Sequence, residues 1–321
     1  MTYKKFTLSF LVKIIDLILN NCYNNYSIYI GRFYIVMSIF DEIMDFYPGN
    51  RIAYGKLLKR LKDGNVIPFI GAGLSTCCYP TWEELLYKLL KNVSDACAQK
   101  VVRHIKNYDY FGAADMLCEE MGELLFYECC REVFDENVIT KDKIKDQAVF
   151  LLPQFRLSTY ITTNYDRVLE KAFDYNGMGF ETGFAYDTYR LTTYMRDNLT
   201  NPMIMKVHGD IRSNNHDLIL TGKSYSLHYR DGSNLKIQLS KWADSKIFLF
   251  IGASLYQDKT ISLIADQMQE GMLNYAIMGV SFSEIIDVKE RISHVNALPI
   301  FYDKKDHGNL TIILQQLLNE L

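Results

Sequence analysis

The sequence has no cysteine after position 130 and only a small excess of negative charge. All seven cysteines lie before that point, and the adjacent pairs Cys77-Cys78 and Cys129-Cys130 lack the C-x2-C spacing of a structural zinc site. So few cysteines in so long a chain favour reduced thiols in a cytoplasmic protein over a disulfide framework. The 35 basic and 38 acidic residues give a net charge of −3, so electrostatics offers no argument for direct nucleic-acid binding.

Long uninterrupted hydrophobic runs are also missing, so no membrane partner is expected. The apolar stretch Phe6–Leu19 contains Lys13 and Asp16, and it is too short and too charged to span a bilayer. Residues 4–23 faintly resemble a signal peptide, but the small residues of a cleavage site are absent. The composition changes near Met37, and two interpretations stay open: an N-terminal extension over residues 1–50, or translation that starts at Met37.

Hydrophobic residues make up 49% of the chain, which is enough for a substantial core and excludes wholesale disorder. At about 150 residues per domain, the length predicts two structural units or one large domain with an insertion. From residue 51 onward, short apolar segments alternate with segments of helical periodicity. This alternation predicts an α/β fold, a Rossmann-like parallel sheet flanked by helices on both faces. Between Trp82 and Pro153 the pattern is helical throughout, which predicts an all-helical insertion of about residues 82–153 after the first strand.

One predicted strand contains a proline, and one segment has no clear hydrophobic period. Pro68 cannot donate a hydrogen bond to a neighbouring strand, so it should lie near the start of its strand or where no partner needs an N–H. Gly177–Asn201 lacks a clear period and is expected to be rich in loops. The expected strands are Val66–Ile70, Thr159–Thr162, Met203–Val207, Leu218–Leu220, Ile247–Ile251, Ala276–Val280 and Pro299–Tyr302. The expected helices include Arg51–Lys62, Asp166–Phe173, Ser224–Lys241, Asp258–Gln269, Ser283–Ile292 and His307–Leu321.

Two glycine-containing turns follow predicted strands. Gly71-Ala72-Gly73-Leu74-Ser75 comes directly after the first strand, and Gly252-Ala253-Ser254 comes after the strand that ends at Ile251. Glycines let backbone N–H groups approach a pyrophosphate closely, and a serine adds a hydroxyl donor. Each turn is equally compatible with a tight connection that binds nothing. Because ligands of open α/β sheets bind beyond the carboxyl ends of the strands, the two turns together favour a nucleotide site.

Two further polar segments end predicted strands. Thr162-Thr163-Asn164-Tyr165-Asp166 follows one of them, where Asp166 is a good N-cap for the next helix but Asn164 is not needed for capping. His208-Gly209-Asp210 follows another. A histidine with a pKa near 6.5 can act as a base near neutral pH, and the glycine leaves room for a ligand beside it. A structural histidine is the alternative.

The order GAGxS, TxNxD, HG and GxS resembles that of the sirtuin (SIR2-like) superfamily over about residues 60–321. Thr163 stands at the glutamine position of the family's TQNID motif. The four-cysteine zinc ribbon of the deacylases is absent, and Tyr79–Leu85 replaces their GIPDFR stretch. Both departures resemble the prokaryotic SIR2-like branch of anti-phage defence, whose members consume NAD. The resemblance therefore implies a SIR2-like NAD-binding domain over residues 51–321 and places protein deacylation in doubt.

The resemblance also implies the chemistry. The expected reaction is hydrolysis of the nicotinamide–ribose bond of NAD, the substrate, without zinc or another metal. A restrained enzyme is implied, controlled by homo-oligomerisation or by a separate sensor or activator protein. A non-catalytic module that senses NAD or ADP-ribose, and a transferase or cyclase on the same fold, remain alternatives. The implied catalytic residues are Asn164 and His208, and the implied NAD-binding residues are Gly71, Ala72, Gly73, Ser75, Thr163, Asp166, Gly252 and Ser254.

Overall fold

One parallel sheet organises the molecule. The computed structural model describes residues 39–184, 201–255, 259–266 and 272–321. Within these ranges seven strands are ordered β3-β4-β2-β1-β5-β6-β7, and every neighbouring pair is parallel, as the alternating pattern predicts. The strands are β1 (Val66–Ile70), β2 (Thr159–Thr162), β3 (Glu181–Phe184), β4 (Met203–Lys206), β5 (Ile247–Ile251), β6 (Asn274–Val280) and β7 (Ala297–Asp303).

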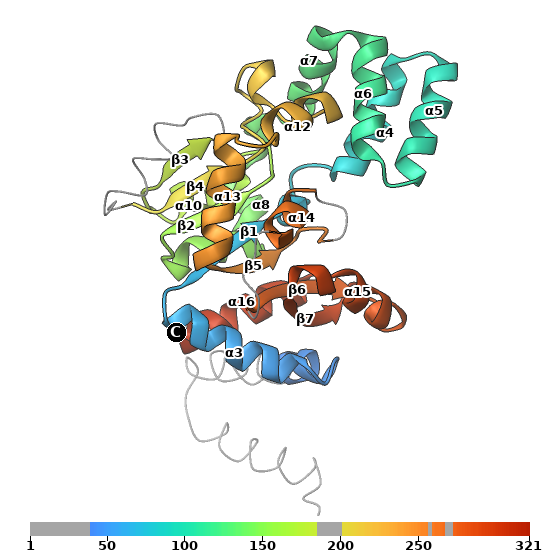
Figure 1. Cartoon of the computed structure of the whole chain (residues 1–321). Coiled ribbons are helices and arrows are strands. Elements are labelled where there is room, and N and C mark those ends of the chain that lie inside the picture. Colours follow the sequence, from blue (N-terminus) through green and yellow to red (C-terminus); the bar gives the residue numbers. More distant parts are fainter. Residues whose placement is uncertain (1–38, 185–200, 256–258, 267–271) are drawn as a thin grey trace, which may run out of the picture.

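Helices cover both faces of this sheet (Figure 1). The connection from β1 to β2 is helical, as expected, and its first four α-helices stand as a bundle beyond one end of the sheet (Figure 1). No helix in the described ranges is long and apolar enough to cross a membrane. The helices are α3 (Asn50–Lys62), α4 (Trp82–Leu89), α5 (Asp95–Lys106), α6 (Tyr110–Met121), α7 (Glu123–Val133), α8 (Lys141–Ile144), α9 (Ala148–Leu151), α10 (Val168–Tyr175), α12 (Gly222–His228), α13 (Asn234–Ser245), α14 (Lys259–Asp266), α15 (Ile285–Arg291) and α16 (Gly308–Glu320).

Alternate residues of the central strand β1 enter two separate cores. Val66 and Ile70 pack with residues of α3, α9, α10 and α16, whereas Ile67 and Phe69 pack on the opposite face with residues of α13, α14 and α15. This two-sided burial explains why β1 is apolar throughout rather than alternating. Pro68 lies at the middle of β1, yet the pairing of β1 with β2 begins only at Phe69, so Pro68 leaves the β2 ladder intact.

Two expectations about strands are wrong. Glu181–Phe184, within the segment expected to form loops, is the edge strand β3 and pairs only with β4. An edge strand pairs on one side only, and β3 is partly exposed. Its sequence therefore lacks the continuous apolar run by which the buried strands were predicted. Leu218–Leu220 is buried but forms no strand. It crosses behind the end of β4, where the N–H of Ile219 donates to the carbonyl of His208 at 3.1 Å.

The helix expected over Ser224–Lys241 is two helices, α12 and α13. Gly232 between them has a φ of +75°, which a helix cannot accommodate, and Ser233 caps α13 by accepting the N–H of Lys236 at 3.2 Å. The helix expected over Asp258–Gln269 is described as Lys259–Asp266, and its remaining ends lie outside the described residues. The hypotheses about residues 1–36 also lie outside them.

Candidate functional site

The topology of the sheet indicates where a ligand can bind. From β1 the chain moves outward to β2 and to the edge strand β3, returns to β4 between these two, and then crosses to the other side of β1 with β5. The order of strands therefore reverses between β1 and β5. A crevice forms beyond the carboxyl ends of the strands at such a point. The turns that begin at Gly71 and Gly252 leave these two strands side by side.

The glycines of the two turns let the turns touch. A Cβ on Gly71 would lie 2.4 Å from the carbonyl oxygen of Gly252, and a Cβ on Gly73 would lie 2.9 Å from the Cα of Gly252. The N–H of Gly71 donates to Ile251 at 3.0 Å, and the N–H of Gly73 donates to Gly252 at 2.9 Å. These two N–H groups hold the turns together, so their role differs from the phosphate contact that the sequence suggests. Gly252 has a φ of +65°, which favours glycine.

Asn164 lies in a buried hydrogen-bonded cluster. Its side-chain nitrogen donates to the carbonyl of Gly71 and to Oγ of Ser75, both at 3.1 Å, so both amide hydrogens are used. A flipped amide would set two oxygens against each other at Gly71, which fixes Oδ1 as the acceptor that is left. Ser75 donates in turn to Oδ1 of Asp166 at 3.0 Å. The cluster therefore joins the first turn to the segment after β2.

Asp166 is not the N-cap predicted for it, because that position is held by Arg167 and Asp166 lies one residue earlier. Its Oδ1 accepts the N–H of Val168, the first residue of α10, at 2.9 Å. The carboxyl is buried, and burial raises its pKa above the usual value, against the lowering effect of Lys206 and of the hydrogen bonds from Val168 and Ser75. Asp166 thus has two roles, because the same oxygen binds the first N–H of α10 and holds Ser75 beside Asn164.

His208 is buried at the end of β4, with 6% of its surface exposed. Its Nε2 lies 3.0 Å from Oγ1 of Thr260, which lies 2.9 Å from the hydroxyl of Tyr229. The imidazole stacks on the ring of Tyr165, with 6.1 Å between centroids and 27° between planes. Burial, aided by the charge of His228, lowers the pKa of His208 to about 3. The ring is therefore neutral at pH 7, and its pKa lies far below the ordinary value on which the sequence argument relied.

The glycine after His208 does not leave space for a ligand, contrary to the expectation from the sequence. Gly209 has a φ of +85°, and a Cβ there would lie 2.5 Å from the carbonyl oxygen of Asp217. The chain itself fills that space, because the segment that includes Asp217 crosses directly over the turn. Gly209 is therefore required by the close approach of backbone.

All ten residues predicted for the site line one cavity of about 830 Å³. They come from four separate segments: Gly71, Ala72, Gly73 and Ser75 after β1; Thr163, Asn164 and Asp166 after β2; His208 after β4; and Gly252 and Ser254 after β5. Sequence reasoning placed each segment at a strand end, and the parallel sheet brings them together.

Other walls of the cavity were missed by sequence reasoning. The helical insertion contributes Trp82, Glu83 and residues 108–111, and the C-terminal part contributes residues 277–279, Tyr302 and His307. Trp82 packs against the ring of Tyr165, with 5.9 Å between centroids. These residues lack a motif of their own. Only the proximity of their elements to the strand ends could have identified them.

In the described part of the chain, no group of three or more histidine, cysteine or carboxylate side chains is placed to hold a metal ion. The six cysteines that the structure describes are free thiols. Cys77 lines the cavity, and its Sγ lies 3.8 Å from that of Cys78.

Comparisons with known proteins point to one family. The model of the SIR2-like domain family matches residues 158–296, which include the segments after β2, β4 and β5. The chain is 26% identical over 215 residues to the NAD(+) hydrolase ThsA of Cytobacillus dafuensis, covering 67% of this chain and 40% of that protein. It is 27% identical over 222 residues to the NAD(+) hydrolase ThsA of Acinetobacter baumannii, covering 68% and 42%. The chain spans about two fifths of the length of these curated relatives. On its fold, its motifs and these matches, the chain carries a SIR2-like domain.

Proposed function

We propose that this chain is an NAD+ hydrolase that cleaves the nicotinamide–ribose bond. The observation that carries the proposal is the convergence of Asn164, His208 and the two glycine turns on one cavity at the point where the strand order reverses. A volume of about 830 Å³ lies in the range of pockets that enclose a cofactor-sized ligand. The relatives named NAD(+) hydrolase support the substrate.

The reaction consumes NAD+ and water and yields nicotinamide, ADP-ribose and a proton. The bond between the ribose carbon and the pyridinium nitrogen breaks with its electron pair on nicotinamide, which leaves uncharged. Positive charge then develops on the ribose, so the site must position a water molecule and avoid a competing cation. A neutral His208 meets the second need, because an imidazolium there would repel the developing charge.

Asn164 and His208 supply the two polar groups that this chemistry needs. With its amide hydrogens bound to Gly71 and Ser75, Asn164 presents Oδ1 as an acceptor for the attacking water or for a ribose hydroxyl. When Nε2 of His208 donates to Thr260, the other ring nitrogen keeps its lone pair and accepts a hydrogen bond from the attacking water or from a ribose hydroxyl.

The binding part of the proposal assigns the phosphates to the two turns. Ala72 supplies a backbone N–H and Ser254 a hydroxyl beside the glycines, and Thr163 supplies a hydroxyl after β2. The hydroxyl of Ser75 donates to Asp166, so Ser75 contributes by holding Asn164 rather than by binding a phosphate. No metal takes part. The glycines bring the turns close enough for one pyrophosphate to contact both.

The wider proposal concerns biological role. An NAD+ hydrolase without restraint would exhaust its host's NAD. We therefore propose an effector of anti-phage defence that acts in the cytoplasm and is held in check by homo-oligomerisation or by a sensor protein. A sensing module that binds NAD without cleaving it, or a transferase or cyclase, is the alternative that the product analysis below distinguishes.

The test is incubation of the purified chain with NAD+ and separation of the products by chromatography. We expect nicotinamide and ADP-ribose from the wild type, and a rate reduced more than tenfold in Asn164→Ala and in His208→Ala, which corresponds to more than about 1.4 kcal/mol in the barrier. The matched controls His294→Ala and Asn319→Ala change exposed residues that do not line the cavity and should keep the wild-type rate. A wild type that cleaves NAD+ while His208→Ala keeps more than half its rate would contradict the catalytic assignment.

A further inference from the structure

A completely buried lysine lies on β4 two residues before His208. The side chain of Lys206 has no exposed surface. Its Nζ donates to the main-chain carbonyls of Asp166 and, at 3.4 Å, of Tyr165. It also lies 3.0 Å from Oε1 of Glu170 and 3.5 Å from Oδ2 of Asp210. One ammonium group thus contacts the segment after β2, helix α10 and the turn after β4.

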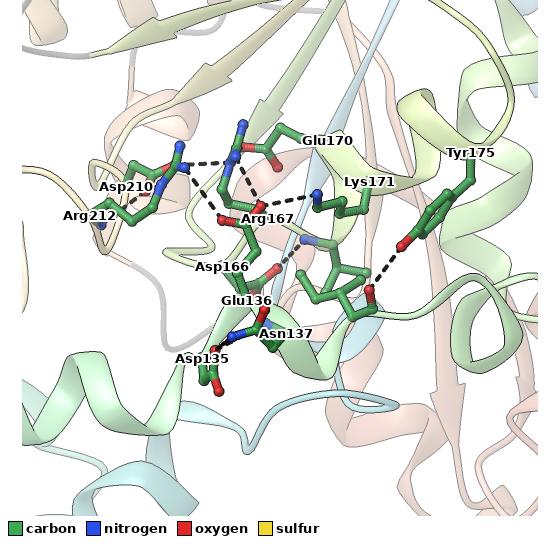
Figure 2. A network of polar contacts seen from close by, with 12 residues as sticks. Asp135, Glu136, Asn137, Asp166, Arg167, Glu170, Lys171, Tyr175, Asp210 and Arg212 are labelled. Carbon is green, nitrogen blue, oxygen red and sulfur yellow. Dashed lines mark hydrogen bonds and ion pairs between the residues drawn. The ribbon is translucent and has the colours of Figure 1, made fainter.

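Lys206 is charged despite its burial. Burial would lower its pKa, but the carboxylates of Glu170, Asp210 and Asp166 together raise it above the ordinary value. Glu170 and Asp210 are themselves buried, and Arg167 lies 3.8 Å from the first and 3.7 Å from the second. Figure 2 shows Arg167, Glu170 and Asp210 close together beside Asp166.

Burying such a cluster is costly, and a set of apolar side chains is often at least as stabilising. A buried ion pair by itself is therefore weak grounds for a role in stability. The position of the donors is more informative, because an apolar side chain at 206 could not bind the two carbonyls. These carbonyls belong to the two residues that follow Asn164.

We propose that Lys206 is a positioning residue for NAD+ cleavage, which fixes the segment that bears Asn164 in register with His208. This inference rests on the function proposed above. The side chain of Lys206 binds the main-chain carbonyls of that segment, and Lys206 itself does not line the cavity.

The segment that bears Asn164 is held from two sides. Asn164 is held toward β1 by Gly71 and Ser75, while Lys206 holds the next two residues toward β4. Tyr165 lies between these two anchors, and its ring stacks on His208. A displacement of about 1 Å between reacting groups can cost on the order of 100-fold in rate. Loss of the lysine donors should therefore reduce turnover more than substrate binding.

The test uses the double variant Lys206→Met/Glu170→Gln, which removes the lysine together with the charge of Glu170 and leaves Asp210 paired with Arg212 at 3.2 Å. We expect kcat to fall at least tenfold while KM for NAD+ changes less than threefold. The matched control Lys145→Met removes an exposed lysine that pairs with Asp142 at 2.8 Å, and it should leave both constants unchanged. Amide hydrogen exchange, followed peptide by peptide, should accelerate over residues 163–168 and stay unchanged over β1 and β5.

The outcomes separate this inference from the proposed function. A kcat within twofold of wild type in the double variant would overturn the positioning role. Exchange that accelerates across the whole sheet, or failure of both Lys206→Met and the double variant to fold, would also overturn it by making Lys206 a structural residue. If the wild type itself never cleaves NAD+, the proposed function fails, and the role of Lys206 in cleavage falls with it. The exchange measurement still reports whether Lys206 orders residues 163–168.

Discussion

At the scale of single residues, the surroundings of His208 show the limit of sequence reasoning. Its place at the end of a strand follows from the apolar run before it, but its pKa depends on groups distant in the sequence. Tyr165, Tyr229 and Thr260 enclose the ring from three other elements. Burial by these neighbours, rather than the histidine itself, sets its protonation state.

The hydroxyl of Thr260 should orient the imidazole of His208. Replacing it with the isosteric Thr260→Val removes the group 3.0 Å from Nε2 and leaves that nitrogen without this partner. One hydrogen bond contributes about 0.5–1.5 kcal/mol, so kcat for NAD+ should fall about 2- to 12-fold. Thr260→Ser keeps the hydroxyl and should retain most of the activity. Equal rates in the valine and serine variants would show that the hydroxyl has no orienting role.

Cys77 should be the most reactive thiol among those described at neutral pH. The contact with the Cys78 thiol lowers the pKa of Cys77 to about 7, whereas burial raises the pKa of Cys97, Cys118 and Cys130. Since the thiolate is the nucleophile, alkylation of Cys77 by iodoacetamide should rise through pH 7 and level off above it. Peptide mass spectrometry against pH measures this.

The matched variant for that prediction is Cys78→Ala. It removes the thiol that contacts Cys77, so the midpoint for alkylation of Cys77 should move upward toward the ordinary value for a cysteine. Because Cys77 lines the cavity, saturating ADP-ribose should also slow the labelling. An unchanged midpoint in Cys78→Ala would show that the neighbouring thiol does not stabilise the thiolate.

At the scale of elements, strands buried on both faces were the most predictable. Val66–Ile70, Thr159–Thr162 and Ile247–Ile251 have the boundaries expected from their apolar runs. The edge strand β3 could not be predicted in this way. It is partly exposed and pairs with one strand only, so its sequence does not need a continuous apolar run. Leu218–Leu220 shows the converse error. Its side chains are buried beside β4, but burial alone does not provide a strand to pair with.

The contact between the turns after β1 and β5 should tolerate no side chain. In Gly71→Ala the new Cβ would lie 2.4 Å from the carbonyl oxygen of Gly252, a backbone atom that cannot rotate away. We expect a loss of about 1–3 kcal/mol in the free energy of unfolding, typical of overpacking, together with loss of NAD+ binding. Urea unfolding and calorimetric titration measure the two effects.

The control for this prediction is Gly55→Ala in α3. A Cβ there would meet no atom within 4 Å, and alanine is the better helix former, so the free energy of unfolding should rise by about 0.5–1 kcal/mol. A Gly71→Ala protein as stable as wild type would show that the two turns can separate, and the close approach would then not define the cavity.

At the scale of the whole molecule, the sequence predicted which segments meet but not how the site is enclosed. Parallel strands bring their carboxyl ends to one edge, so the four motifs had to converge once the sheet was predicted. The enclosure depends on how the helical insertion folds back over that edge. Trp82 and residues 108–111 reach the cavity from α4 and from the start of α6, through packing that no local pattern encodes.

The buried imidazole should also make the stability of the whole protein depend on pH. The folded state holds the pKa of His208 near 3, whereas an unfolded chain protonates histidine near pH 6.5. Below pH 6.5 the unfolded state therefore binds one more proton, and the free energy of unfolding falls as the pH falls. Between pH 6.5 and pH 5 this linkage amounts to about 2 kcal/mol.

Urea unfolding at a series of pH values, in wild type and in His208→Gln, isolates this contribution. Carboxylates that titrate in both proteins largely cancel in the difference between the two curves, and glutamine has no proton to gain. The curves should therefore converge as the pH falls from 6.5 to 5, because wild type loses about 2 kcal/mol that the variant does not lose. Curves that stay parallel would mean that the pKa of His208 is nearly the same in the folded and the unfolded protein, so that the histidine is not buried away from water. A histidine with an ordinary pKa would be partly protonated near neutral pH, and its positive charge would oppose the charge that develops on the ribose. His208 would then not be the neutral group proposed beside the ribose.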